Sequence, residues 1–127
     1  MHTDETEINL VSEPVIGGAF RVINTLGTGF LEKLYEKALA HELRKGGLAV
    51  ARQHGIAVRY DGIVVGEYAV DLLVEQRVMV ELKVARVLDD VHAAQCINYL
   101  KATGLRLCLL INFAKPRLEV RRFTHGT

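Results

Sequence analysis

Three charged residues fall within an otherwise apolar segment, at a spacing that would bring them together on a β-hairpin. The segment runs from Tyr68 to Lys83, and a turn centred on Gln76 would place Asp71 directly opposite Glu81. Opposed side chains of paired strands lie about 5 Å apart at Cβ, where two carboxylates repel one another. Lys83 follows Glu81 by two residues and therefore shares its face of the strand. Two carboxylates beside a lysine in an apolar setting predict a binding site for a metal cation.

The two faces of this hairpin differ in character. One face is wholly apolar, and we expect it to belong to the core; the other mixes the charged trio with apolar residues. A buried charge is tolerated where it is paired or binds metal, so the mixed face predicts a covering helix with a cleft at one end. The apolar face carries Val70, Leu72, Val74, Val78, Val80, Leu82 and Val84, and the mixed face carries Ala69, Asp71, Leu73, Met79, Glu81 and Lys83.

The elements that must position this hairpin are predicted in the order ααβββαββ, a mixed sheet with helices on its faces. Ser12-Glu13-Pro14 is typical of a helix start, and this helix is expected to end near Leu26. A second helix should run from Gly29 to the Gly46-Gly47 pair. Strands are expected over residues 56–60, 64–74, 78–84, 105–113 and 118–123, and a third helix over 89–104.

Length and composition indicate a globular protein. The chain has 127 residues, of which 50% are hydrophobic and 24% charged, enough for one domain with a real core. We expect an acidic tail over residues 1–11 and a single domain over 12–127. No apolar stretch is long enough to cross a bilayer, and the N-terminus lacks the apolar region of a signal peptide. Cys96 and Cys108 form no CxxC pair, which favours free thiols in a reducing cytoplasm.

The charge is unevenly distributed along the chain. The first thirteen residues carry Asp4, Glu5, Glu7 and Glu13 without any Lys or Arg, and the remaining residues have a balance of +5. A mildly basic domain behind an acidic tail is compatible with a polyanionic partner such as nucleic acid.

The segment Gly29-Phe-Leu-Glu32-Lys-Leu-Tyr35 resembles the motif that names the GxxExxY proteins, which fall within the PD-(D/E)XK nuclease superfamily. The resemblance covers roughly residues 13–123. Ala114 stands where glycine is expected after Asn-Phe, a departure that bears on a turn and leaves the chemistry alone. Further matching segments follow in order: Tyr68-Ala-Val-Asp71, Val80-Glu81-Leu-Lys83, His92-Ala-Ala-Gln95-Cys-Ile-Asn-Tyr99-Leu and Leu110-Ile-Asn112-Phe113.

This resemblance implies an α/β fold in which a mixed central sheet is flanked by helices. The core would be the restriction-endonuclease-like αβββαβ arrangement, with an extra helix at the N-terminus. Glu32 would lie on the first core helix and Gln95 on the helix after the hairpin. The implied catalytic residues are Glu32, Asp71, Glu81, Lys83 and Gln95.

The implied activity is metal-dependent hydrolysis of phosphodiester bonds in DNA or RNA. A hard divalent cation with oxygen ligands lowers the pKa of bound water and polarises a phosphoryl group. Asp71, Glu81 and Glu32 would hold Mg²⁺ or Mn²⁺, with the Leu82 carbonyl as a further ligand. Lys83 would orient the attacking water or stabilise developing negative charge.

Three further residues are expected to support the site or position the substrate. Gln95 and Tyr99 lie four residues apart on one helix face, where they could position Lys83 or the phosphate. For Tyr35 a packing role with a hydrogen-bonded hydroxyl is favoured over catalysis, and for Gly29 a role in the turn is favoured over contact with substrate.

Two alternatives stay open at the level of sequence. Asp71 and Lys83 could form a structural ion pair, and Glu32 could simply favour the positive end of its helix. The whole domain could then be a non-catalytic nucleic-acid-binding or assembly module that retains the nuclease fold. Under either reading, specificity would come from a partner protein or a homo-oligomer, since no recognition helix is apparent. The residue pattern predicts no membrane partner.

Overall fold

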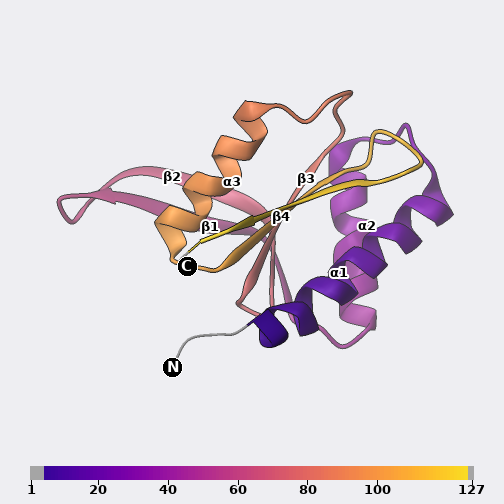
Figure 1. The fold of residues 1–127 in the computed structure, drawn as a ribbon, viewed down its shortest axis with the longest axis horizontal. Helices are drawn as coiled ribbons and strands as arrows, with labels where there is room; N and C mark the ends of the chain where they lie inside the picture. The colour runs from indigo at the N-terminus through magenta and orange to yellow at the C-terminus, as the bar shows by residue number, and fades with distance from the viewer. Residues whose placement is uncertain (1–4, 126–127) are drawn as a thin grey trace.

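The strands form one mixed sheet with helices on both faces, as the sequence predicted (Figure 1). The computed structural model describes residues 5–125, and the predicted features of residues 1–4 and 126–127 lie outside this range. Within it the elements are, in chain order, α1 (Glu5–Leu26), α2 (Glu32–Lys45), β1 (Val50–Tyr60), β2 (Ile63–Val74), β3 (Val78–Lys83), α3 (Asp90–Thr103), β4 (Leu107–Asn112) and β5 (Glu119–Thr124).

The sheet has the strand order β1-β2-β3-β4-β5. Strands β3 and β4 are parallel, with Val78 paired with Leu107, and the other neighbouring strands are antiparallel. A parallel pair needs a long crossover connection, and here α3 supplies it. This α/β arrangement is consistent with a restriction-endonuclease-like fold, and α1 is the extra N-terminal helix.

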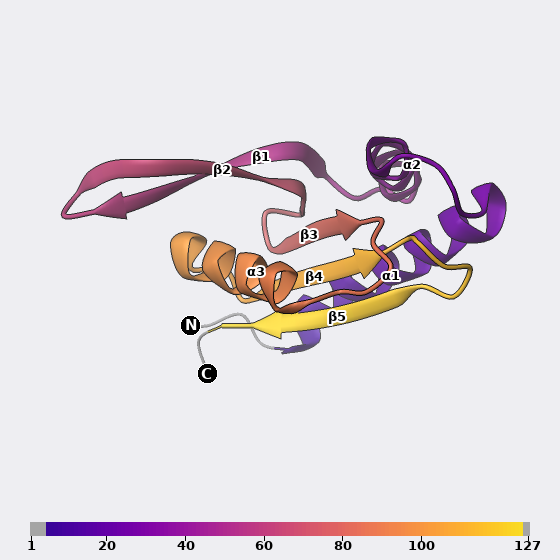
Figure 2. The same cartoon turned by 90° about the horizontal axis from the view of Figure 1, so that it is seen from above.

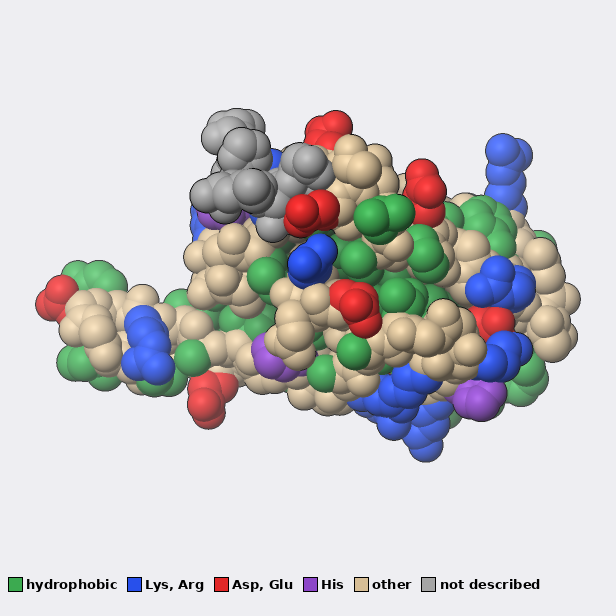
Figure 3. Space-filling view, turned by 90° about the horizontal axis from the view of Figure 1, so that it is seen from below, with side chains coloured by type: hydrophobic (Ala, Val, Ile, Leu, Met, Phe, Trp, Pro, Cys, Tyr) green, Lys and Arg blue, Asp and Glu red, His purple; other side chains and the backbone are tan. Residues whose placement is uncertain are grey.

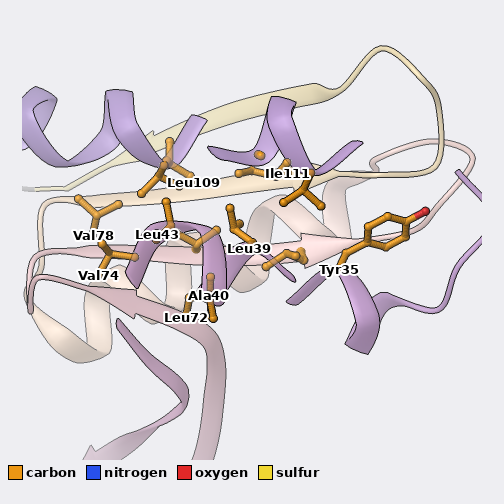
Figure 4. Close-up of a cluster of buried hydrophobic side chains, with 14 of the residues drawn as sticks. Tyr35, Leu39, Ala40, Leu43, Leu72, Val74, Val78, Leu109 and Ile111 are labelled. Carbon is orange, nitrogen blue, oxygen red and sulfur yellow. The ribbon is translucent and has the colours of Figure 1, made fainter. Parts of the chain in front are cut away.

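Helices α1 and α2 cover one face of the sheet and α3 covers the other. The apolar side of α2 is buried against the sheet. This burial stabilises the contact, because each fully buried side chain contributes about 1.5–3 kcal/mol relative to an exposed one. On the opposite face, Cys96, Tyr99 and Leu100 of α3 pack against Met79 and Leu110. The contact between α2 and the sheet is made by Tyr35, Leu39, Ala40 and Leu43 against Leu72, Val74, Val78, Leu109 and Ile111 (Figure 4).

Strands β1 and β2 extend past the rest of the sheet as a two-stranded arm (Figure 2). Its turn is Asp61-Gly62, as predicted, and both residues have positive φ values of 56° and 77°, as a type I′ hairpin requires. Hydrophobic side chains gather at the end of the arm (Figure 3). They include Tyr60, Ile63 and Val65, all exposed.

The structure corrects the predicted start of the first helix. Residues 5–11, expected in an acidic tail, are the first turns of α1. The helix extends this far because Ile8 and Val11 are buried against the core. Ser12 is therefore no helix cap: it is fully buried, and its hydroxyl accepts a hydrogen bond from Arg122 at 3.4 Å.

Two residues assigned to the apolar face of the hairpin lie elsewhere. Val70 packs in the cluster under α3, and Val84 lies beyond the end of β3 with its side chain partly exposed. Val70 precedes Leu72, the first residue of β2 that pairs with β3, and therefore lies in the part of β2 that pairs with β1 alone. The first strand also begins at Val50 rather than near residue 56, because its early residues pair with the buried end of β2.

Candidate metal centre

Asp71 and Glu81 face each other across β2 and β3. Leu72 pairs with Val80, so the next residues outward, Asp71 and Glu81, are opposite, as the hairpin pattern predicted. Both are buried, with exposed fractions of 9% and 3%. At this point the backbone N–H groups of β2 and β3 bond the carboxylates. The Asp71 N–H donates to Glu81 Oε1 at 3.2 Å, and the Leu82 N–H donates to Asp71 Oδ2 at 2.8 Å.

Lys83 completes the predicted trio at the end of β3. Its Nζ lies 3.6 Å from Glu81 Oε2, and its side chain is largely buried. The backbone at this point is fixed by β4, because the Phe113 N–H donates to the Lys83 carbonyl at 2.8 Å. The chain that follows is held by Asn112, a buried residue whose side chain bonds both the N–H and the carbonyl of Ala85. The ammonium group is therefore presented from a rigid strand end.

Burial and mutual repulsion disfavour ionisation of both carboxylates. Desolvation, reinforced by the charge of Asp71, raises the pKa of Glu81 from 4.5 to about 7. Desolvation also raises the pKa of Asp71, although hydrogen bonds from the Leu82 N–H and from Gln53 act in the opposite direction. Such a pair is electrostatically suited to a cation, because a nearby positive charge offsets the free-energy cost of ionising two buried carboxyl groups.

Glu32 is the first residue of α2 and lies near the pair without joining it. Burial raises the pKa of Glu32, the charge of Lys83 lowers it and the charge of Asp71 raises it, which places its carboxylate in the same electrostatic environment. Nevertheless, among the described residues no three His, Cys, Asp or Glu side chains form a group that could hold a metal ion. Glu32 thus stands apart from the pair that it was predicted to complete.

A third buried carboxylate, Glu36, was not predicted from the sequence and is linked to the pair of Asp71 and Glu81. The side chain of Gln53 bridges the two, because its Nε2 lies 2.7 Å from Glu36 Oε1 and 3.0 Å from Asp71 Oδ1. Glu36 also accepts from Arg52 at 3.0 Å and from Lys33 at 3.3 Å. The charge of Glu36 is therefore balanced by Arg52 and Lys33, and its carboxylate holds Gln53 against Asp71.

Gln95 and Tyr99 lie on the inner face of α3, beside the pair but bonded to one another. The Gln95 amide donates to the Tyr99 hydroxyl at 2.7 Å, and this hydroxyl lies 3.5 Å from the Ala69 carbonyl. Burial, and then the charge of Glu81, raises the pKa of Tyr99. Neither residue forms a hydrogen bond with Lys83 in the described part of the chain, so their predicted positioning roles stay predictions.

The turn before α2 shows what Tyr35 and Gly29 do. The Tyr35 hydroxyl donates to the Gly27 carbonyl at 2.6 Å and accepts from the Phe30 N–H at 3.3 Å. Its ring stacks on Phe113 at a centroid distance of 4.8 Å. Gly29 has a φ of 101°, which side chains other than glycine rarely adopt. The structure thus shows packing with a hydrogen-bonded hydroxyl for Tyr35 and a turn conformation for Gly29, and contact of either residue with substrate stays a prediction.

The residues present fit a hard divalent cation. Mg²⁺ characteristically takes one or two protein carboxylates and completes its shell with water and substrate phosphate, so the pair of Asp71 and Glu81 is sufficient without a third acid. The Leu82 N–H points toward Asp71, and in an extended strand the carbonyl of a residue points to the same edge as its N–H. A ligand role for the Leu82 carbonyl stays a prediction.

Comparison with known proteins identifies the class. A family model described as the PD-(D/E)XK nuclease superfamily matches residues 9–123, and the chain therefore belongs to this superfamily. No curated protein and no solved structure gives a significant match. Within residues 5–125, no helix combines the length and apolar character needed to cross a membrane.

Proposed function

We propose that the protein is a metal-dependent nuclease of the GxxExxY type, which hydrolyses phosphodiester bonds in DNA or RNA. Membership of the nuclease superfamily supports a nuclease-like function. The observation that carries the proposal is the opposed pair of buried carboxylates, Asp71 and Glu81, with Lys83 Nζ 3.6 Å from Glu81. Two free buried cysteines support a reducing, cytoplasmic location.

In this proposal Asp71, Glu81 and the Leu82 carbonyl hold Mg²⁺ or Mn²⁺. When bound, the cation supplies a water of lowered pKa and polarises the scissile phosphate. The carboxylates provide its negative ligands on two paired strands, which keep them at a fixed separation. Glu32, at the start of α2, lies apart from the pair but within reach of its electrostatic field, and would contact the cation through water.

Lys83 orients the attacking water or stabilises the charge that develops on the phosphoryl oxygens. Its backbone is held by β4, and its Nζ lies 3.6 Å from Glu81 Oε2, beside the carboxylate pair. Gln53 holds Asp71 Oδ1 at 3.0 Å, and Glu36 holds Gln53 in turn. We assign these two residues positioning roles, since they act on the reaction through Asp71.

The test is a cleavage assay of the purified protein with Mg²⁺ or Mn²⁺ on single-stranded and duplex DNA and RNA. Lys83→Met should lower the rate by about 10²–10³-fold, the usual cost of losing one charge-stabilising donor. Glu67→Gln, an exposed change on β2, is the matched control and should retain activity. Equal cleavage by wild type and Lys83→Met would refute the proposal. Metal-independent binding of nucleic acid without any cleavage would favour the non-catalytic module instead.

A further inference from the structure

A groove runs between the β1–β2 arm and α3, next to the candidate metal centre. It encloses about 540 Å³, within the range of ligand-binding cavities. The side chains that give it its character are Tyr68, Tyr99, Gln95, Asn98, Arg59 and Lys101.

The groove combines aromatic surface with positive charge. Tyr68 is 56% exposed, and its ring lies 6.1 Å from that of Tyr99. Arg59 and Lys101 provide two cations, and no acidic residue of the described chain lines the groove. Aromatic faces with nearby cations are the elements that bind unpaired bases and their phosphates.

A local irregularity of β1 directs Arg59 into the groove. The register of β1 and β2 shifts between Val58 and Arg59, and such a bulge re-aims the side chains that follow it. After the shift Arg59 pairs with Val64, whereas Val58 pairs with Gly66. Because Val64 and Gly66 share one face of β2, Arg59 and Val58 both line the groove although they are consecutive.

The groove ends near the strand segment that carries Asp71. Gln95 and Tyr99 line the groove, and the Tyr99 hydroxyl lies 3.5 Å from the Ala69 carbonyl, two residues before Asp71. A strand bound along the groove would therefore approach the carboxylate pair at its inner end.

We propose that this groove binds a single-stranded segment of nucleic acid, with an unpaired base stacked on Tyr68 and phosphates held by Arg59 and Lys101. The inference builds on the proposed function by assigning its substrate class. Stacking on an exposed ring requires a base free of its partner, whereas a duplex offers only its charged backbone. The groove therefore discriminates in favour of single strands, including single-stranded ends of a duplex.

The first test uses Tyr68→Trp as a stacking reporter, because the chain contains no other tryptophan. In EDTA, an oligothymidine of about ten nucleotides, within the usual site sizes, should quench its fluorescence saturably. A duplex of equal length should quench it less. Tyr60→Trp is the matched control, since Tyr60 is 74% exposed near the end of the arm and does not line the groove. Equal quenching of both reporters, or none of Tyr68→Trp, would overturn the proposal.

The second test measures affinity by fluorescence anisotropy of the labelled oligothymidine. Tyr68→Ala should weaken binding about 5- to 100-fold, the usual cost of one lost stacking contact. Lys101→Gln should weaken it and reduce the dependence of log affinity on log salt by about 0.7, as expected for one phosphate contact. Lys37→Gln on the exposed side of α2 removes the same charge and should have little effect. Equal losses for the two lysine variants would refute the assignment.

These measurements separate the groove from the metal centre, because they are made without metal and without cleavage. Binding that depends on Tyr68 in a protein that cleaves nothing would support the groove and refute the proposed nuclease. Cleavage of single strands with an unchanged KM in Tyr68→Ala would support the nuclease and refute the groove. Thermal unfolding followed by circular dichroism establishes that each variant is folded, and Tyr68→Phe should retain affinity.

Discussion

Replacing Glu81 by Gln should stabilise the metal-free protein at neutral and alkaline pH. Glu81 has a pKa of about 7 in the folded protein against an ordinary value of 4.5. Between these values the folded state binds more protons than the unfolded state, so the free energy of unfolding falls as pH rises. Above about pH 7 the full loss of folding stability caused by ionised Glu81 is present, and below about pH 4.5 this loss vanishes.

The magnitude follows from the size of that interval. At about 1.4 kcal/mol per pH unit, the rise from 4.5 to about 7 corresponds to at most about 3.5 kcal/mol. The substitution also removes the partner of Lys83, 3.6 Å away, which offsets part of the gain. We therefore expect Glu81→Gln to be more stable than wild type by about 1–3 kcal/mol near pH 8 and by much less near pH 4.5.

Urea unfolding in EDTA, followed by far-ultraviolet circular dichroism, measures this difference at both pH values. Glu67→Gln removes an exposed carboxylate from the same sheet and should leave the difference near zero at both. The reasoning is refuted if the difference between wild type and Glu81→Gln does not grow with pH, or if Glu81→Gln is the less stable protein near pH 8.

Three further predictions concern packing and positioning. Gly18→Ala should destabilise the protein by about 1–3 kcal/mol, because a Cβ there would lie 2.9 Å from a Leu43 methyl group. Gly17→Ala meets no such contact and should leave the stability unchanged. Thermal unfolding measures the difference between the two variants. Tyr35→Phe should cost about 1 kcal/mol through its lost hydroxyl bonds, and urea unfolding showing no loss would contradict this. Gln53→Ala should lower kcat more than it raises KM, because it frees Asp71 without touching substrate, and equal effects on both would argue against a positioning role.

The central hairpin was predictable because its pattern is redundant. Alternating apolar residues, the Glu75-Gln76-Arg77 turn and the length of each strand all specify one register, so the pairing of Leu72 with Val80 followed from sequence. The opposition of Asp71 and Glu81 then required no further information. A slip of one residue would have moved every apolar side chain to the wrong face.

Glu36 and Gln53 were not predicted because their roles depend on tertiary contacts. Gln53 adopts a φ of 51°, a conformation that no local signal in its segment indicates. Glu36 did carry a signal: it lies on the same helical stripe as Leu39 and Leu43, three and seven residues later. An acid on a buried stripe requires partners, and Arg52, which supplies one at 3.0 Å, comes from a strand that begins earlier than expected.

The start of α1 was placed too late for a similar reason. The segment from Ser12 to Pro14 matches a helix start locally. The apolar residues before it, however, are more stable when buried against the core than when exposed to water. Ile8 and Val11 reach the core, so the helix continues back to Glu5. Proline is accommodated within it at an exposed position, where water can bond the carbonyl that its missing N–H leaves free.

The most direct test of the central claim is isothermal titration of the protein with Mn²⁺ near pH 7, beside the variant Asp71→Asn/Glu81→Gln. We expect saturable binding that the variant loses. We also expect a heat that varies with the ionisation enthalpy of the buffer, because Glu81, with its pKa of about 7, must release its proton to bind the ion. Binding that the double variant retains, or no saturable binding by the wild type, would contradict a metal centre at this pair of carboxylates.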